Sequence, residues 1–135
     1  MRKVIIAAAA GFMAFGGALA IPVKADDTAA YASVIQGHVN AYRARDLDAF
    51  VATFAPDAVV VANGIPARGR ASIRAFYAAN FSPNAPTIRI NASHMDGGRL
   101  YMEAAYIMAD GSEMCCSQAH YTVENGLITR LDVTG

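Results

Sequence analysis

The stretch that decides the fold reads VIQGHVNAYRARDLDAFVATFAPDAVVV over residues 34–61 and RGRASIRAFY over residues 68–77. Its first part carries apolar residues at helical spacing, with His38 on the same stripe as Tyr42, and this predicts a first helix. Asp46 is placed to cap a second, short helix, because its carboxylate can accept hydrogen bonds from the free N–H groups of the first turn. The stretch therefore predicts that the chain begins with helices and that any strands follow them.

Strands are predicted for most of the chain that follows. Pro56 is expected to end the second helix, and a β-rich run over 58–62 is closed by the turn-forming Asn63-Gly64. A third helix is expected from about Arg70. Its predicted inward side chains are those of Ile73, Phe76, Tyr77 and Phe81. Four strands separated by glycine turns are then predicted, over 88–95, 100–108, 113–123 and 127–133. Helices followed by a meander indicate the α+β class.

The chain after residue 27 resembles the nuclear transport factor 2-like superfamily, in particular its SnoaL-like and ketosteroid-isomerase-like branches. The resemblance is carried by the helical stretch quoted above together with Asp46-Leu-Asp48, Asp57-Ala58 and Phe76-Tyr77. It implies a cone-shaped α+β fold in which three N-terminal helices pack on a curved, mainly antiparallel sheet. It also implies a pocket for a small molecule between the helices and the sheet.

Under the same resemblance, the positions of the catalytic acids of the steroid isomerases hold other residues in this chain. Those enzymes use an aspartate base, and a tyrosine with a protonated aspartic acid as donors to the oxyanion. The corresponding positions here hold Ala62, His38 and Ala119. Loss of the base alone would forfeit a factor of roughly 10² to 10⁴ in rate, so isomerisation by that mechanism is not expected.

His38 is the candidate catalytic residue, because an imidazole can act as acid, base or donor near neutral pH. The alternative is a core histidine bonded to a neighbour. A His94 and Asp96 dyad is a weaker alternative site. Candidate ligand-binding residues are those expected to face the pocket: Tyr42, Phe54, Asn63, Phe76, Tyr77, Ser117, Ala119 and Tyr121. No cofactor and no metal site are expected, because the histidines are isolated from each other and from the cysteines.

The first 25 residues are expected to be a signal peptide, since a basic pair is followed by an apolar run and small residues suit cleavage after Ala25 or Ala20. An uncleaved anchor is the alternative. The expected mature domain, residues 26–135, keeps eight arginines and eleven acids, which gives a net charge of −3. Without a basic run, neither nucleic acid nor a membrane surface is an expected partner after cleavage. We expect an exported protein, periplasmic or secreted.

The two cysteines are adjacent, Cys115 and Cys116. Neighbours on a regular strand point to opposite faces, so no disulfide between them is expected. The thiols are predicted to be buried, to link two subunits, or to be reactive. On the same reasoning Met114, Cys116 and Gln118 would share an outer face that could join two copies of the chain.

Two functional hypotheses remain open from the sequence. In the first, the protein binds a small hydrophobic or aromatic molecule, and His38 with a tyrosine orients one carbonyl or hydroxyl group. In the second, it is an isomerase, cyclase or dehydratase in which His38 and a pocket tyrosine assist proton transfer on a small carbonyl substrate. A third, purely structural use as a homodimerisation domain would need a filled cone.

Overall fold

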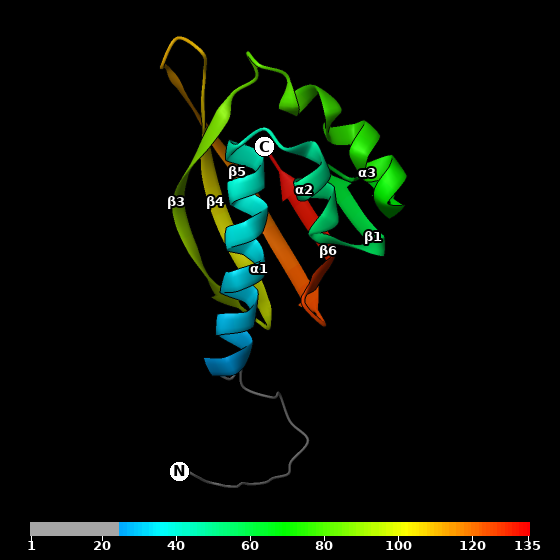
Figure 1. Ribbon diagram of the computed structural model, residues 1–135. Coiled ribbons are helices and arrows are strands. Elements are labelled where there is room, and N and C mark those ends of the chain that lie inside the picture. Colours follow the sequence, from blue (N-terminus) through cyan, green and yellow to red (C-terminus); the bar gives the residue numbers. More distant parts are fainter. Residues whose placement is uncertain (1–24) are drawn as a thin grey trace, which may run out of the picture.

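The computed structural model describes residues 25–135, and their side chains from residue 28. The predicted signal segment lies, up to residue 24, outside the described residues. Three helices, α1 (Ala25–Arg43), α2 (Leu47–Ala52) and α3 (Gly69–Tyr77), pack on the same side of a curved sheet (Figure 1). The predicted α+β class and cone are confirmed. Within the described range no helix has the length and apolar character needed to cross a membrane.

The two N-terminal helices are joined by a tight turn that the sequence encodes. Arg45 takes a left-handed backbone conformation with φ of 58°. The Asp46 side chain then accepts a hydrogen bond from Ala49 N at 3.0 Å, which confirms the predicted cap of α2. The helix ends at Ala52, before Pro56. Pro56 lies instead in β1 (Phe54–Ala62), where pairing with β6 is interrupted, so its missing N–H costs no ladder bond there.

The sheet contains the described strands in the order β2-β1-β6-β5-β4-β3. All neighbours are antiparallel except β1 and β6 (Leu127–Thr134), which run parallel. A short strand that was not predicted, β2 (Ile65–Arg68), pairs with β1 through a two-residue turn at Asn63 and Gly64, both with positive φ. The remaining strands are β3 (Thr87–Asp96), β4 (Arg99–Ile107) and β5 (Glu113–Glu124), close to their predicted bounds.

The core lies between the helices and the inner face of the sheet. Ile73 of α3 is fully buried, whereas Phe76 is 46% exposed, so the prediction that Phe76 faces inward was wrong. Adjacent helical positions differ by about 100° around the axis, and Tyr77 takes the inward place one turn after Ile73. A 3₁₀ turn, η1 (Ala78–Phe81), then leads into β3 and carries Phe81 against the core.

The inward faces predicted for the last two strands are confirmed at the cavity, although the pairing shifts at two places, one between Thr122 and Val123 and one near the start of β5. Ser117, Ala119 and Tyr121 of β5 face inward, as do Leu131 and Val133 of β6. Toward the start of β5 the pairing with β4 shifts: Ser117 pairs with Ala104 and Met114 with Tyr106. Cys115 and Cys116 therefore lie together opposite the single residue Ala105, which defines a β-bulge.

The bulge overturns the prediction for the cysteines, because the structure joins Cys115 to Cys116 in a disulfide. Two residues opposite one break the period of two, so neighbouring side chains can leave the strand on the same face. Ala104 and Tyr106 face inward, and Ala105 between them faces outward with the disulfide. The bulge also places Met114 on the side of its partner Tyr106, not on the outer face with Gln118 as expected.

Candidate functional site

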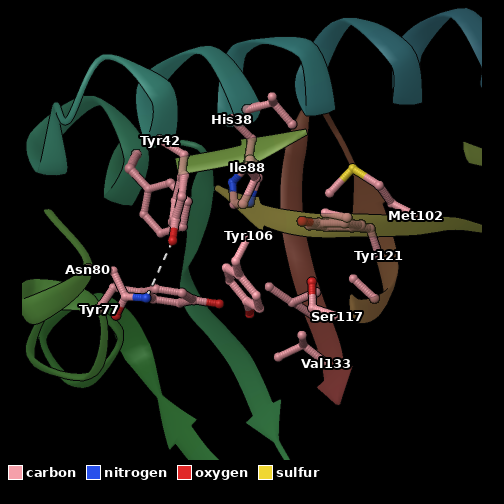
Figure 2. Close-up of a pocket in the computed structure, with 15 residues that line it drawn as sticks. His38, Tyr42, Tyr77, Asn80, Ile88, Met102, Tyr106, Ser117, Tyr121 and Val133 are labelled. Atoms are coloured by element: carbon pink, nitrogen blue, oxygen red, sulfur yellow. Dashed lines mark hydrogen bonds between the residues drawn. The ribbon is translucent and has the colours of Figure 1, made fainter. Parts of the chain in front are cut away.

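A cavity lies between α1, α2, η1 and the inner face of the sheet (Figure 2). The volume of this cavity is about 70 Å³. This is far below the roughly 300–1,000 Å³ of sites for drug-sized ligands. Its walls are formed by His38, Val39, Tyr42, Phe50, Tyr77, Asn80, Ile88, Met102, Ala104, Tyr106, Ser117, Ala119, Tyr121, Leu131 and Val133. A ligand of this space must be compact.

The structure brings together six of the nine predicted site residues. Those that line the cavity are His38, Tyr42, Tyr77, Ser117, Ala119 and Tyr121. The other three lie outside it. Phe54 is fully buried in the core behind the His38 ring, Phe76 is at the surface, and Asn63 is exposed in the hairpin turn. There the Asn63 side chain accepts a hydrogen bond from Gly135 N at 3.2 Å, which ties the turn to the end of β6.

His38 is held on α1 by one hydrogen bond whose direction can be assigned. Its Nδ1 lies 3.0 Å from Thr53 Oγ1, and that hydroxyl also lies 2.7 Å from Phe50 O. A carbonyl oxygen has no proton to give, so the single hydroxyl proton of Thr53 goes to Phe50. His38 Nδ1 must then carry the ring proton and donate it to Thr53. The Nε2 atom is left with its lone pair, and no partner for it exists among residues 28–135.

The surroundings of His38 keep it uncharged. The side chain is 4% exposed, and its ring centroid lies 4.4 Å from that of Phe50 and 5.2 Å from that of Tyr121. Burial among these rings lowers the pKa of His38 from 6.5 to about 3. The charged form is disfavoured because it would lose its hydration without gaining a partner. Near neutral pH His38 therefore offers the cavity a hydrogen-bond acceptor and no acid.

Tyrosine hydroxyls supply the donors. Burial raises the pKa values of Tyr77 and Tyr121, and the nearby phenol groups of Tyr42 and Tyr106 raise them further. These hydroxyls stay protonated at any ordinary pH. Tyr42 Oη accepts a hydrogen bond from Asn80 Nδ2 at 3.4 Å, whereas the hydroxyls of Tyr77 and Tyr121 have no hydrogen-bond partner in the described part of the chain (Figure 2). They are available to a ligand.

Among the residues that the structure describes, no carboxylate, lysine or arginine lines the cavity. The weaker alternative, a His94 and Asp96 dyad, is not formed in the structure. Asp96 Oδ2 lies 3.3 Å from His120 Nε2 instead, and His94 packs on the ring of Tyr101. His120 lies on the outer face, since its strand neighbours Ala119 and Tyr121 face the cavity. The cavity thus contains polar groups that are all neutral.

Sequence reasoning missed several lining residues. Tyr106 follows Met102 and Ala104 at alternate positions of β4, so the same alternation that placed Ser117 could have found it. Asn80 lies in the 3₁₀ turn, for which no periodic signal exists. Asn80 and Tyr106 also border a shallower depression that reaches Met108 and Met114, so they mark the place where the cavity opens toward the surface.

Helices on one face of a curled, mainly antiparallel sheet, with a cavity between them, define the nuclear transport factor 2-like class of proteins. Residues 35–131 match the SnoaL-like domain family, and the chain belongs to that family. No protein of curated function matches it.

Solved structures agree with this assignment. A "putative polyketide cyclase" from Sinorhizobium meliloti is 26% identical, with 75% of this chain and 93% of that chain covered and a TM-score of 0.65. A protein of unknown function from Mesorhizobium loti reaches a TM-score of 0.70 at 17% identity, with 82% and 94% covered. A "putative ketosteroid isomerase" from Kribbella flavida reaches 0.68 at 17% identity, with 80% and 78% covered. The last two likenesses show the fold alone.

Proposed function

We propose that this SnoaL-like protein binds a small, uncharged, largely apolar molecule in the cavity between α1 and the sheet. The observation that carries the proposal is a set of buried and half-buried neutral polar groups with unused hydrogen-bonding capacity. His38 Nε2 and the hydroxyls of Tyr77 and Tyr121 have no protein partner among the described residues. Buried polar groups without partners are costly, so their convergence on a cavity favours a ligand that satisfies them.

The lining defines the chemistry of this ligand. A charged molecule would be buried without a counter-ion, because no charged side chain within residues 28–135 lines the cavity. His38 Nε2 requires a donor, such as a hydroxyl or an N–H group. Tyr77 and Tyr121 require an acceptor. Phe50, Leu131 and the other apolar walls suit a ring or a short branched chain. A compact alcohol, phenol or hydroxyketone meets these requirements.

Catalysis is the second candidate function. It is favoured by the unprotonated Nε2 atom of His38 on the cavity wall and by the polyketide cyclase name of the Sinorhizobium relative. A base works best when its pKa lies near the working pH, and burial lowers that of His38 to about 3. The cavity therefore supports binding and orientation of a ligand better than proton abstraction.

The test is a binding screen with matched ligands and matched variants. Phenol, cyclohexanol and 2-cyclohexenone are titrated by calorimetry and thermal shift, with benzoate as a charged molecule of similar size. We expect the neutral compounds to bind and benzoate not to bind. Tyr121→Phe removes one hydroxyl and should weaken binding roughly 2- to 10-fold. Tyr101→Phe, on the outer face, should leave it unchanged.

Two results would count against the binding function. Failure of every neutral compound to bind would remove the basis for the proposed binding function. The same holds if the Tyr121→Phe and Tyr77→Phe variants bind the neutral compounds as tightly as the unchanged protein does. Ultraviolet absorbance of the enone, recorded in the same samples, distinguishes binding from turnover. Conversion that is lost in His38→Ala would establish the catalytic alternative.

We also propose that the protein is exported after removal of the N-terminal segment. The support is the basic pair Arg2-Lys3 followed by an apolar run and small residues before Ala20 and Ala25. N-terminal sequencing of the protein from the extracytoplasmic fraction tests this. A chain that keeps residues 1–25 in the cytoplasm would contradict it.

A further inference from the structure

The outer face of the sheet carries a second group of chemistry-bearing side chains, whose two cysteines also border the depression beside Asn80 and Tyr106. It centres on the β-bulge that places Cys115 and Cys116 opposite Ala105 of β4. Met102 and Ala104 line the cavity, so Glu103 between them points to the other face of the sheet. The bulge therefore brings two sulfur atoms and one carboxylate to the same outer surface.

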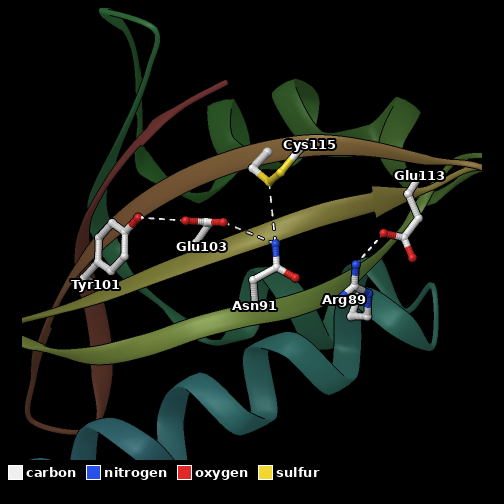
Figure 3. The surroundings of a disulfide bond; sticks show 7 residues. Arg89, Asn91, Tyr101, Glu103, Glu113 and Cys115 are labelled. Carbon is white, nitrogen blue, oxygen red and sulfur yellow. Dashed lines mark hydrogen bonds and ion pairs between the residues drawn. A yellow bond between two sulfur atoms is a disulfide. The ribbon is translucent and has the colours of Figure 1, made fainter.

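These donor atoms are close together and held in place. The sulfur atoms of both cysteines and a carboxylate oxygen of Glu103 all lie within 4.8 Å of one another. Asn91 of β3 organises them, since its Nδ2 lies 3.3 Å from Glu103 Oε2 and 3.5 Å from Cys116 Sγ (Figure 3). Cys115 is exposed, and Cys116 and Glu103 are half-buried, so the group is open to solvent.

The disulfide here does not cross-link distant parts of the fold. It joins adjacent residues of one strand, so it closes the smallest loop that a disulfide can close. Constraint of the unfolded chain grows with loop length, and it is least for such a bond. Its reduction leaves the helices, the sheet order and the cavity without any lost tertiary link. The pair is therefore suited to change its redox state while the protein stays folded.

We propose that the reduced Cys115–Cys116 pair and Glu103 form a binding site for a thiophilic divalent cation of the zinc and cadmium class. Reduction takes two electrons and two protons from a small-molecule or protein dithiol. The S–S bond breaks, two thiols form, and the dithiol becomes its own disulfide. The cation then displaces the two thiol protons and is held by two thiolates and one carboxylate.

The donor set and its spacing fit such a cation. Thiolate sulfur lies about 2.3 Å and carboxylate oxygen about 2.0–2.2 Å from a bound zinc ion, so two of its ligands are separated by no more than about 4.5 Å. Once the S–S bond is broken the two sulfur atoms must move apart to become separate ligands, and Glu103 has to approach them from a separation of at most 4.8 Å. Thiolates select zinc-class ions over magnesium and calcium. The fourth position of a tetrahedron faces solvent.

The site exists only in one redox state. In the disulfide form neither sulfur is a thiolate, and Glu103 alone with a neighbouring amide is a weak ligand. Reduction adds both soft donors at once. Cation binding is therefore coupled to the redox state of the bulge, and the exposed Cys115 gives an external dithiol a point of attack.

Cadmium provides a direct readout of thiolate coordination. Purified protein is reduced with a dithiol, freed of it under anaerobic conditions, and titrated with Cd²⁺ while the thiolate-to-cadmium charge-transfer absorption is recorded. We expect one ion per chain for the reduced protein and no band for the oxidised protein. Cys115→Ser and Cys116→Ser should each lose the band. Glu103→Gln should weaken binding at least about tenfold.

Glu113→Gln is the matched control. Glu113 also lies on the outer face at the start of β5, where it is paired with Arg89 and is not part of the donor group (Figure 3). Its replacement should leave cadmium affinity unchanged, and circular dichroism checks that each variant is folded. The proposal is overturned if the oxidised protein binds equally well, if the reduced protein gives no charge-transfer band, or if Glu103→Gln and Glu113→Gln bind alike. None of these results depends on a ligand in the cavity.

Discussion

Acidification should destabilise this protein through His38. In the folded state the ring is enclosed by Phe50, Phe54 and Tyr121, and burial lowers its pKa from 6.5 to about 3. In the unfolded chain the ring is hydrated and takes up a proton near pH 6.5. Below that pH the unfolded state binds one proton more than the folded state, so protonation favours unfolding.

The size of the effect follows from these two pKa values. The stabilising contribution of neutral His38 is complete above pH 6.5 and falls by about 1.4 kcal/mol for each pH unit below it, until the folded ring titrates near pH 3. Between pH 6.5 and pH 4 the loss is roughly 3 kcal/mol, a large part of the total stability of a small domain. Asp110 and Asp132, whose pKa values are held below 3.8, keep their stabilising contribution over this range and lose it only as the pH falls further.

Urea unfolding at pH 7, 6, 5 and 4 measures this slope. His38→Phe keeps an aromatic ring in the same place but cannot titrate, so its free energy of unfolding should change much less over this range. His120→Gln, on the outer face, should keep the slope of the unchanged protein. The reasoning is refuted if the slope is the same in His38→Phe, or if NMR shows the His38 ring titrating near pH 6.5 in the folded protein.

Two further predictions concern stability. Tyr121→Phe removes a buried hydroxyl that has no partner among the described residues, so we expect urea unfolding to show unchanged or increased stability, by up to about 1 kcal/mol; a loss of more than that would show that the hydroxyl is satisfied. Asp46→Ala should cost about 1 kcal/mol, because the bond to Ala49 N at the start of α2 is lost, whereas Asp57→Ala at an exposed position of β1 should cost little; equal thermal shifts would contradict the capping role.

Local signals in the sequence were sufficient for most of the fold. Asp46 caps α2 because the capping bond depends only on neighbouring residues. Asn63-Gly64 and Asn125-Gly126 form turns because both pairs tolerate positive φ, which two-residue hairpins require. Even so, β2 was missed. Four residues with Pro66 among them carry too little alternation to indicate a strand, and only pairing with β1 makes them one.

The wrong predictions concern side-chain orientation. They arose where the orientation depends on competition for one buried position of a helix or on the pairing of two strands. Phe76 and Tyr77 are both aromatic and adjacent, and the one inward position at that turn of α3 is taken by Tyr77. The bulge at Cys115 is a mismatch between β4 and β5, and no single strand encodes it. Counting back from Ser117 gives the wrong face for Cys115 and Met114, which is why the disulfide and the position of Met114 were both missed.

The assignment of the His38 proton changes what the site can recognise. The resemblance to steroid isomerases suggested a donor at this position, acting on a carbonyl oxygen. Thr53 donates its only hydroxyl proton in a hydrogen bond to Phe50 O and so accepts a hydrogen bond from His38 Nδ1–H, which leaves Nε2 as an acceptor toward the cavity. Thr53→Val should remove this constraint and allow the other tautomer. Ligands with a hydroxyl should then lose affinity relative to ketones of the same shape, and nitrogen-15 chemical shifts of the His38 ring would report the exchange directly. An unchanged preference in Thr53→Val, with the Nδ1–H tautomer retained, would show that the protein around Nε2, not Thr53, determines which molecule the cavity accepts.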